Sequence, residues 1–171
     1  QESRSYGSNV AGAGLLGSKW LTDAADMRLI SPSALDITVI SNAASKRVFR
    51  MDLGGYTITS PGDSSWTLVR DTMNYQFILT DWRNGDVFIF HDFQTAKPGL
   101  LKEKTTLEWR SAGREGSVYT HNASNQVTQV TSPDGQDYNL AFNYTGSKIT
   151  QLEVRTGADT STRTRRVEYT Y

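Results

Sequence analysis

Apolar and polar residues alternate along much of this chain, in short runs separated by turn-forming residues. The run from Tyr75 to Thr80 places apolar side chains at every second position. A period of two indicates a β-strand with one face toward a core. Asn84-Gly85 follows and predicts a type I′ hairpin turn, whose twist suits the flanking strands. The next run, residues 87–93, is apolar in both alternating sets and is expected to be a central strand covered on both faces.

The same pattern recurs from one end of the chain to the other. Further strands are expected around residues 35–39, 48–51, 56–58 and 66–68. One helical turn near Thr22-Asp23 and a strand over 27–29 are both compatible with the sequence there, and no helical stripe of useful length occurs elsewhere. We therefore predict an all-β fold of many short antiparallel strands, wound into a curved wall or an open spiral.

A repeat is visible between Val118 and Val154. The pair Val127 and Val130 recurs as Ile149 and Leu152, a shift of 149 minus 127, or 22 residues. Aromatic residues precede each polar turn, and the aliphatic pair follows it. A fixed period of this kind predicts stacked units that bury a common face. A third copy begins with three alternating apolar residues, Val167, Tyr169 and Tyr171.

These repeats resemble a known family. Aromatic-x-aromatic, an Asn/Gly turn, an aliphatic pair and then Ser-Pro-Asp-Gly at 132–135 are similar to the YD repeat of RHS (rearrangement hotspot) proteins. Residues 14–20, 34–52, 54–71 and 82–92 look like the region that precedes such repeats. The resemblance implies a non-catalytic segment of a β-shell that encloses or displays another part of the polypeptide, often a toxin. It also implies export to the cell surface or out of the cell, in bacteria.

The domain organisation follows from these patterns. Residues 1–19 are rich in Gly, Ala and Ser and are expected to be a flexible arm. Residues 20–117 form a β-rich region, and residues 118–171 hold two repeats and the start of a third. A chain of 171 residues fits a single domain that includes all three parts.

Composition excludes several classes of function. Lys+Arg and Asp+Glu are 18 each, so no long-range field steers nucleic acid toward the chain. The basic run Arg163, Arg165 and Arg166 is interpreted as a solvated edge, and no nucleic-acid partner is predicted. The absence of cysteine excludes disulfides and thiolate sites. No apolar run approaches the roughly 20 residues of a membrane span.

The search for catalytic chemistry names no site. His91 and His121 are the two histidines, and we expect them in different strand neighbourhoods. Asp92 follows His91 directly, so on a strand the two side chains point to opposite faces and cannot share a metal ion. No nucleophile, base and orienting group can be named together. We predict no enzyme activity, no metal and no cofactor.

Two other kinds of function remain open. The chain could be an extracellular adhesion or filament module whose copies associate through sheet edges. It could also be a carbohydrate-binding domain with a platform of exposed aromatic rings, for which the candidates are Trp66, Trp82 and Trp109.

The last strand is the candidate interaction site. Val167, Tyr169 and Tyr171 alternate with polar residues and should form an edge with unpaired backbone groups. We expect this edge to pair with the remainder of a larger polypeptide or with a neighbouring copy of the chain, which would give a homo-oligomer.

Overall fold

The computed structural model describes residues 4–6, 13–14, 17–18, 20–22, 27–41, 45–53, 55–60, 65–132, 139–155, 163–168 and 170. Within these ranges, thirteen strands form one sheet in which every strand pairs antiparallel with the next along the chain. The strands are β5 (Arg28–Ile30), β6 (Asp36–Ile40), β7 (Lys46–Asp52), β8 (Gly55–Ser60), β9 (Trp66–Asp71), β10 (Gln76–Asp81), β11 (Asp86–His91), β12 (Leu101–Thr105), β13 (Ser117–His121), β14 (Val127–Thr131), β15 (Asn139–Thr145), β16 (Lys148–Arg155) and β17 (Arg163–Glu168). The predicted all-β class is confirmed.

Short strands also occur in the segment expected to be a flexible arm. β1 (Arg4–Tyr6) pairs with β4 (Trp20–Thr22), and β2 (Ala13–Gly14) pairs with β3 (Gly17–Ser18). The strand expected over 27–29 is confirmed by β5. Thr22 ends β4, and Asp23 lies outside the described residues.

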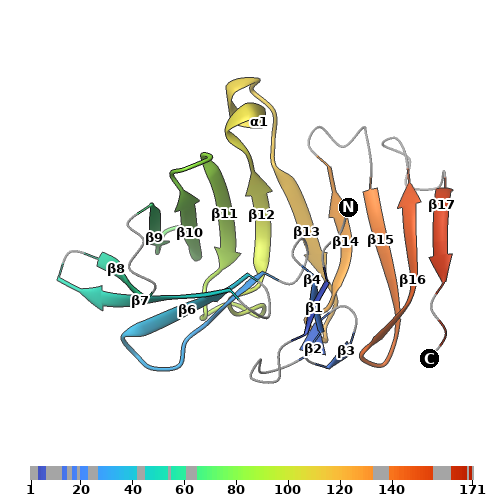
Figure 1. The fold of residues 1–171 in the computed structure, drawn as a ribbon, viewed down its shortest axis with the longest axis horizontal. Coiled ribbons are helices and arrows are strands. Elements are labelled where there is room, and N and C mark those ends of the chain that lie inside the picture. The colour runs from blue at the N-terminus through green and yellow to red at the C-terminus, as the bar shows by residue number, and fades with distance from the viewer. Residues whose placement is uncertain are drawn as a thin grey trace.

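Strands β5–β12 and the connection at residues 92–100 form a unit that we call the roll. The sheet turns a corner between β8 and β9, which pair only at Tyr56 and Leu68. Figure 1 shows β6–β8 lying across the foot of the upright strands β9–β12. The Leu29 amide donates to the Gly99 carbonyl (2.8 Å), and Arg28 bridges to Leu100. The first strand of the sheet is thereby attached to the segment that leads into β12.

The interior of the roll holds the largest buried side chains of the described residues. Phe49 comes from β7, while Phe77, Leu79 and Phe90 come from β10 and β11, and all four are almost fully buried. On β11 only Phe88 and Phe90 are buried, whereas Val87 and Ile89 are half-buried. The expectation that β11 is central is met, because β10 and β12 flank it, but its second face is only partly covered.

The turns after β9 and β10 share one design, which corrects the predicted type I′ turn. Asp81 pairs with Asp86, so the four residues between them form the turn. Of these four residues, only Gly85 has a positive φ (75°). A type I′ turn would need a positive φ at two successive residues. The Asp81 carboxylate accepts the Arg83 amide (3.1 Å), which starts a wider turn that Gly85 completes.

A short helix, α1 (Leu107–Ser111), interrupts the strands after β12 and was not predicted. The Thr106 side chain accepts a hydrogen bond from the Trp109 amide, which is the usual role of a threonine at a helix N-terminus. The helix is too short to produce a recognisable apolar stripe, so periodicity alone does not find it.

Strands β13–β17 continue the sheet beyond the roll, and we call them the wing. Figure 1 shows them side by side to the right of β12, with β17 outermost. They are two hairpins, β13–β14 and β15–β16, followed by β17, which pairs with β16. The turn at 132–135 lies mostly outside the described residues.

Candidate functional site

The two hairpins of the wing pair equivalent residues. Tyr119 lies opposite Val130 in the first hairpin, and Phe142 lies opposite Leu152 in the second. A register shift then occurs in both hairpins, immediately before His121 and immediately before Tyr144. Beyond the shift, the pairs are His121 with Val127 and Tyr144 with Ile149. The shifts are β-bulges, which increase the local twist of a strand at the same place in each hairpin.

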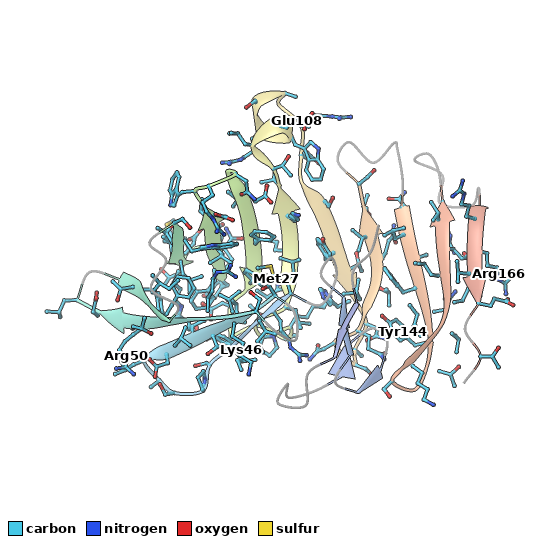
Figure 2. The ribbon with its side chains drawn as sticks, viewed as in Figure 1. Met27, Lys46, Arg50, Glu108, Tyr144 and Arg166 are labelled. Carbon is cyan, nitrogen blue, oxygen red and sulfur yellow. The ribbon has the colours of Figure 1, made fainter. Side chains whose placement is uncertain are left out.

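Side chains tie one hairpin to the next. The Tyr144 hydroxyl donates to the Val127 carbonyl (2.7 Å), and the Gln126 amide nitrogen donates to the Gly146 carbonyl (2.8 Å). The first contact connects β15 with β14. The second connects the turn between β15 and β16 with the turn that precedes β14. The Tyr144 side chain is labelled on the lower part of the wing in Figure 2. Hairpins that are joined in this way stack in a fixed orientation.

One row of apolar residues crosses the wing and ends at its edge. Phe142, Leu152 and Val167 lie opposite one another on β15, β16 and β17. Phe142 is buried and Leu152 half-buried, whereas Val167 is 48% exposed. Among the described residues β17 pairs with β16 alone, so its other edge is open. Tyr169 and Tyr171, predicted to continue this edge, lie outside the described residues.

The opposite row of the wing is polar. Glu153 is buried and lies opposite Arg166 of β17 in the register of the sheet. Its carboxylate accepts hydrogen bonds from Gln151 and from Arg155 (2.7 Å to the Arg155 guanidinium), the neighbours two positions away on β16. Arg166 is exposed and forms an ion pair with Glu168 on its own strand. The edge strand therefore carries one apolar and one charged row.

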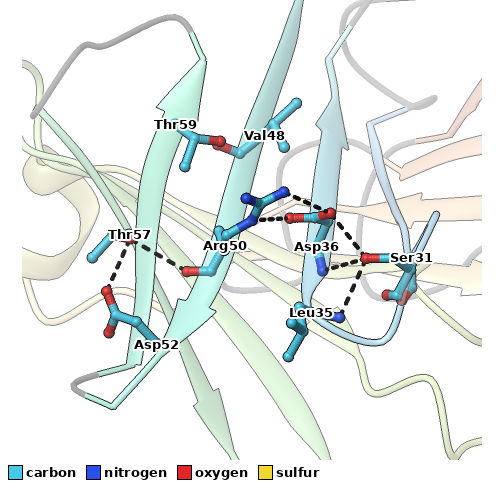
Figure 3. A network of polar contacts seen from close by, with 9 residues as sticks. Ser31, Leu35, Asp36, Val48, Arg50, Asp52, Thr57 and Thr59 are labelled. Carbon is cyan, nitrogen blue, oxygen red and sulfur yellow. Dashed lines mark hydrogen bonds and ion pairs between the residues drawn. The ribbon is translucent and has the colours of Figure 1, made fainter.

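A second polar network lies on the roll (Figure 3). The Arg50 guanidinium donates twice to Asp36, at 2.8 and 3.3 Å, and this ion pair lowers the pKa of Asp36 together with a bond from Ser33. The Thr57 hydroxyl donates to the Arg50 carbonyl (3.3 Å) and to Asp52 (3.2 Å). Arg50 is largely exposed, so these contacts join β6, β7 and β8 at the surface. We assign them a structural role.

The three tryptophans proposed for a carbohydrate platform have different surroundings. Trp66 is only 7% exposed, with the Arg47 guanidinium 4.1 Å from its ring centre and the Phe88 ring stacked at 6.1 Å. A platform must be accessible to the sugar, so the position of Trp66 in the core rules it out for this role. Trp82 is 67% exposed and donates from its indole nitrogen to Thr67 (3.1 Å), and Trp109 is half-buried on α1.

The two histidines meet, contrary to the expectation that they lie in different strand neighbourhoods. Their ring centroids are 6.4 Å apart, with an interplanar angle of 77°. His91 ends β11 and His121 ends β13. Both strands are antiparallel to β12, so they run in the same direction and their last residues reach the same end of the sheet. The position of each histidine at the end of a strand can be read from the sequence, but their contact follows only once the order of the strands in the sheet is known.

Burial and nearby lysines hold both histidines neutral. Burial, with smaller contributions from the charges of Lys97 and His91, lowers the pKa of His121 to about 4. Burial also lowers the pKa of His91, with additional contributions from Lys102 and Lys97. Within the described ranges, no three His, Asp or Glu side chains are grouped closely enough to hold a metal ion.

No family model matches the chain, and no curated protein matches it. Among the helices of the described residues, none is long and apolar enough to cross a membrane.

Proposed function

We propose that this chain is a non-catalytic structural segment of a β-shell of the RHS/YD-repeat kind, within a secreted or cell-surface protein. The single observation that carries the proposal is the equivalence of the two wing hairpins. They share cross-strand pairs and the position of the bulge. The connection beyond the bulge, from His121 to Val127 and from Tyr144 to Ile149, is one residue shorter in the second hairpin. A unit that is repeated in this way extends a wall by adding further units.

The order of the strands supports the same role. Every strand of the large sheet pairs with its neighbours in sequence, so the sheet grows in one direction as the chain is made. The wing exposes more of its apolar row at each step toward β17, up to Val167. A further strand beside β17 would cover that row and satisfy the open backbone groups. Cross-strand pairs of this kind contribute roughly 0.2–1 kcal/mol each.

The kind of strand that would pair with the open edge of β17 follows from the order of strands in the hairpins. Within each hairpin, an aromatic-bearing strand is followed by an aliphatic one, as β15 is followed by β16. β17 occupies the place of β15 in a third unit, because it pairs with the aliphatic strand of the preceding hairpin, as β15 pairs with β14. The strand expected on its open edge is therefore an equivalent of β14 or β16.

An extended chain tests this directly. The variant carries a short turn after residue 171, followed by a second copy of residues 146–155, and the control carries the same ten residues in scrambled order. We expect the true copy to raise the free energy of unfolding by about 1–2 kcal/mol and to slow amide exchange in β17. Urea denaturation and residue-resolved hydrogen exchange measure the two effects. Equal stability and equal exchange in both variants would contradict the proposal.

The adhesion or filament alternative uses the same open edge, with a second copy as the partner. Sedimentation of the unextended chain over a wide concentration range separates the two. A matched pair of substitutions assigns any association to the edge, because Val167 on β17 is 48% exposed and Val118 on the internal strand β13 is 43% exposed. Association that Val167→Lys abolishes and Val118→Lys leaves intact would establish edge-to-edge assembly, since an edge lysine blocks strand pairing.

A further inference from the structure

A cluster of basic side chains lies where the roll meets the wing. His91 comes from β11, Lys102 from β12, His121 from β13, and Lys97 from the connection before β12. The two imidazole rings meet edge to face at 6.4 Å. Both lysine ammonium groups are close enough to His91 to act on its charge. Segments that are up to 30 positions apart in sequence thus bring four basic groups to one place.

The lysines are held by neutral oxygens. The Lys97 ammonium donates to the His121 carbonyl (3.1 Å), and the Lys102 ammonium donates to the Gln76 side-chain oxygen (3.3 Å). Gln76 in turn donates to Asp71 (3.2 Å), which fixes the direction of its amide. In the described part of the chain neither lysine forms an ion pair. Each ammonium has three N–H donors, so both keep donors for another acceptor.

The deepest member of the cluster has an unused polar atom. His121 is only 7% exposed, and no group in the described ranges forms a hydrogen bond with its buried Nδ1. His91, Lys97 and Lys102 are half-buried, and the His91 ring contacts the His121 ring while Lys97 bonds to the His121 carbonyl. A buried imidazole nitrogen without a partner is costly, and such atoms in native proteins call for an explanation. A bound group that accepts or shares a proton at Nδ1 would provide the missing partner.

We propose that His91, Lys97, Lys102 and His121 form a binding site for a tetrahedral oxyanion, a phosphate or sulfate group. Lysine and histidine are compact donors that approach from separate elements, which suits an anion with oxygens in several directions. A planar carboxylate is better matched by the fork of an arginine, which the cluster lacks. A divalent cation is disfavoured by the two ammonium charges beside the imidazoles.

Nuclear magnetic resonance of the histidine ring protons tests the site, because the chain has two histidines. The probes are inorganic phosphate, sulfate and acetate, each added at constant ionic strength against chloride. We expect phosphate and sulfate to shift both ring signals in a saturable way, with a dissociation constant of about 1 mM or below. Bound anion should also raise both histidine pKa values. His91→Gln leaves a single ring signal and assigns the other to His121.

A matched pair of lysine variants locates the site. Lys102→Gln should weaken phosphate binding at least about tenfold, because a charge-assisted bond is lost. Lys46→Gln removes the same charge from an exposed position on β7 and should change nothing. Lys97→Gln provides a second test in case Lys102→Gln fails to fold.

Four results would overturn the proposal. These are no saturable shift with phosphate or sulfate, an equal response to acetate, an equal loss of binding in Lys46→Gln, and saturation of the ring signals by Zn²⁺ without any response to the oxyanions.

Discussion

The roll and the wing are built from the same antiparallel meander, yet they bury their apolar residues to different degrees. In the roll, two walls of one sheet face each other, and Leu79 and Phe90 are completely buried between them. In the wing, a single layer presents its apolar row, and Leu152 remains half-buried while Val167 is exposed. The sequence pattern is alike in both regions. Closure of the sheet on itself, rather than composition, decides which strands acquire a core.

Closure depends on a few backbone contacts. The corner between β8 and β9 is joined by one residue pair, and the two walls meet again where Leu29 donates to Gly99. A β-carbon at Gly99 would lie 2.2 Å from the Leu29 carbonyl oxygen, and Gly99 has a φ of 69°. The residue must therefore be glycine both for space and for backbone conformation.

The largest expected effect comes from this position. Gly99→Ala should lower the free energy of unfolding by about 3 kcal/mol or more, since it adds overpacking to an unfavourable φ. Gly146→Ala is the matched control in the wing, where φ is 60° and nothing lies within 4 Å of the added carbon. It should cost only about 1 kcal/mol. Urea denaturation measures both, and equal losses would mean that the Gly99 contact does not close the roll.

Truncation of leucine compares the two interiors. Leu79→Ala, in the middle of the roll, should cost about 3–4 kcal/mol, because it removes buried methyl groups and leaves a cavity. Leu152→Ala, in the half-buried row of the wing, should cost about 1–2 kcal/mol, since less apolar area is lost and water can fill the space. Urea denaturation of the two variants and of the unmodified chain measures both losses. A larger loss for Leu152 would show that the wing has a second wall.

Acid should act on the boundary between the two regions. The ordinary pKa of a histidine is 6.5, whereas that of His121 in the folded chain is about 4, so between these values the unfolded chain binds more protons than the folded one. Stability is complete above the unfolded value and falls as the pH is lowered. From pH 7 to pH 5 the loss from His121 should be about 2 kcal/mol, and the lowered pKa of His91 adds to it in the same direction.

The control for this prediction is His121→Gln, which should have a flatter dependence on pH in the same interval. Asp36 and Asp71 do not interfere, because their pKa values lie below the ordinary 3.8 and the stability that they contribute is lost at lower pH. Thermal denaturation at several pH values provides the measurement. An unchanged slope in the variant would show that other groups take up the protons.

Much of the fold could be predicted from alternation and turn residues, because each strand is short and its signal is local. The strands of β10 and β11 follow directly from the runs that begin at Tyr75 and Val87. Tyr75 itself is in the preceding turn with a φ of 51°, which an aromatic residue seldom adopts and which no pattern reveals.

The candidate sites were less accessible to sequence reasoning. The burial of Trp66 depends on Arg47 from another strand, and the meeting of His91 with His121 depends on strand order. Such contacts are fixed by how the sheet closes, and closure is a property of the whole chain. The exposed Val167 was predictable because an edge strand exposes residues by its position alone.

Residue-resolved amide hydrogen exchange of the dilute chain tests the central claim most directly, namely that a closed roll continues into a wing that is open at β17. The account predicts the slowest exchange in β10 and β11, progressively faster exchange from β13 toward β17, and the fastest strand amides in β17. Protection in β17 equal to that in β10, in a chain that sediments as a monomer, would show that the edge is already covered and would contradict the account.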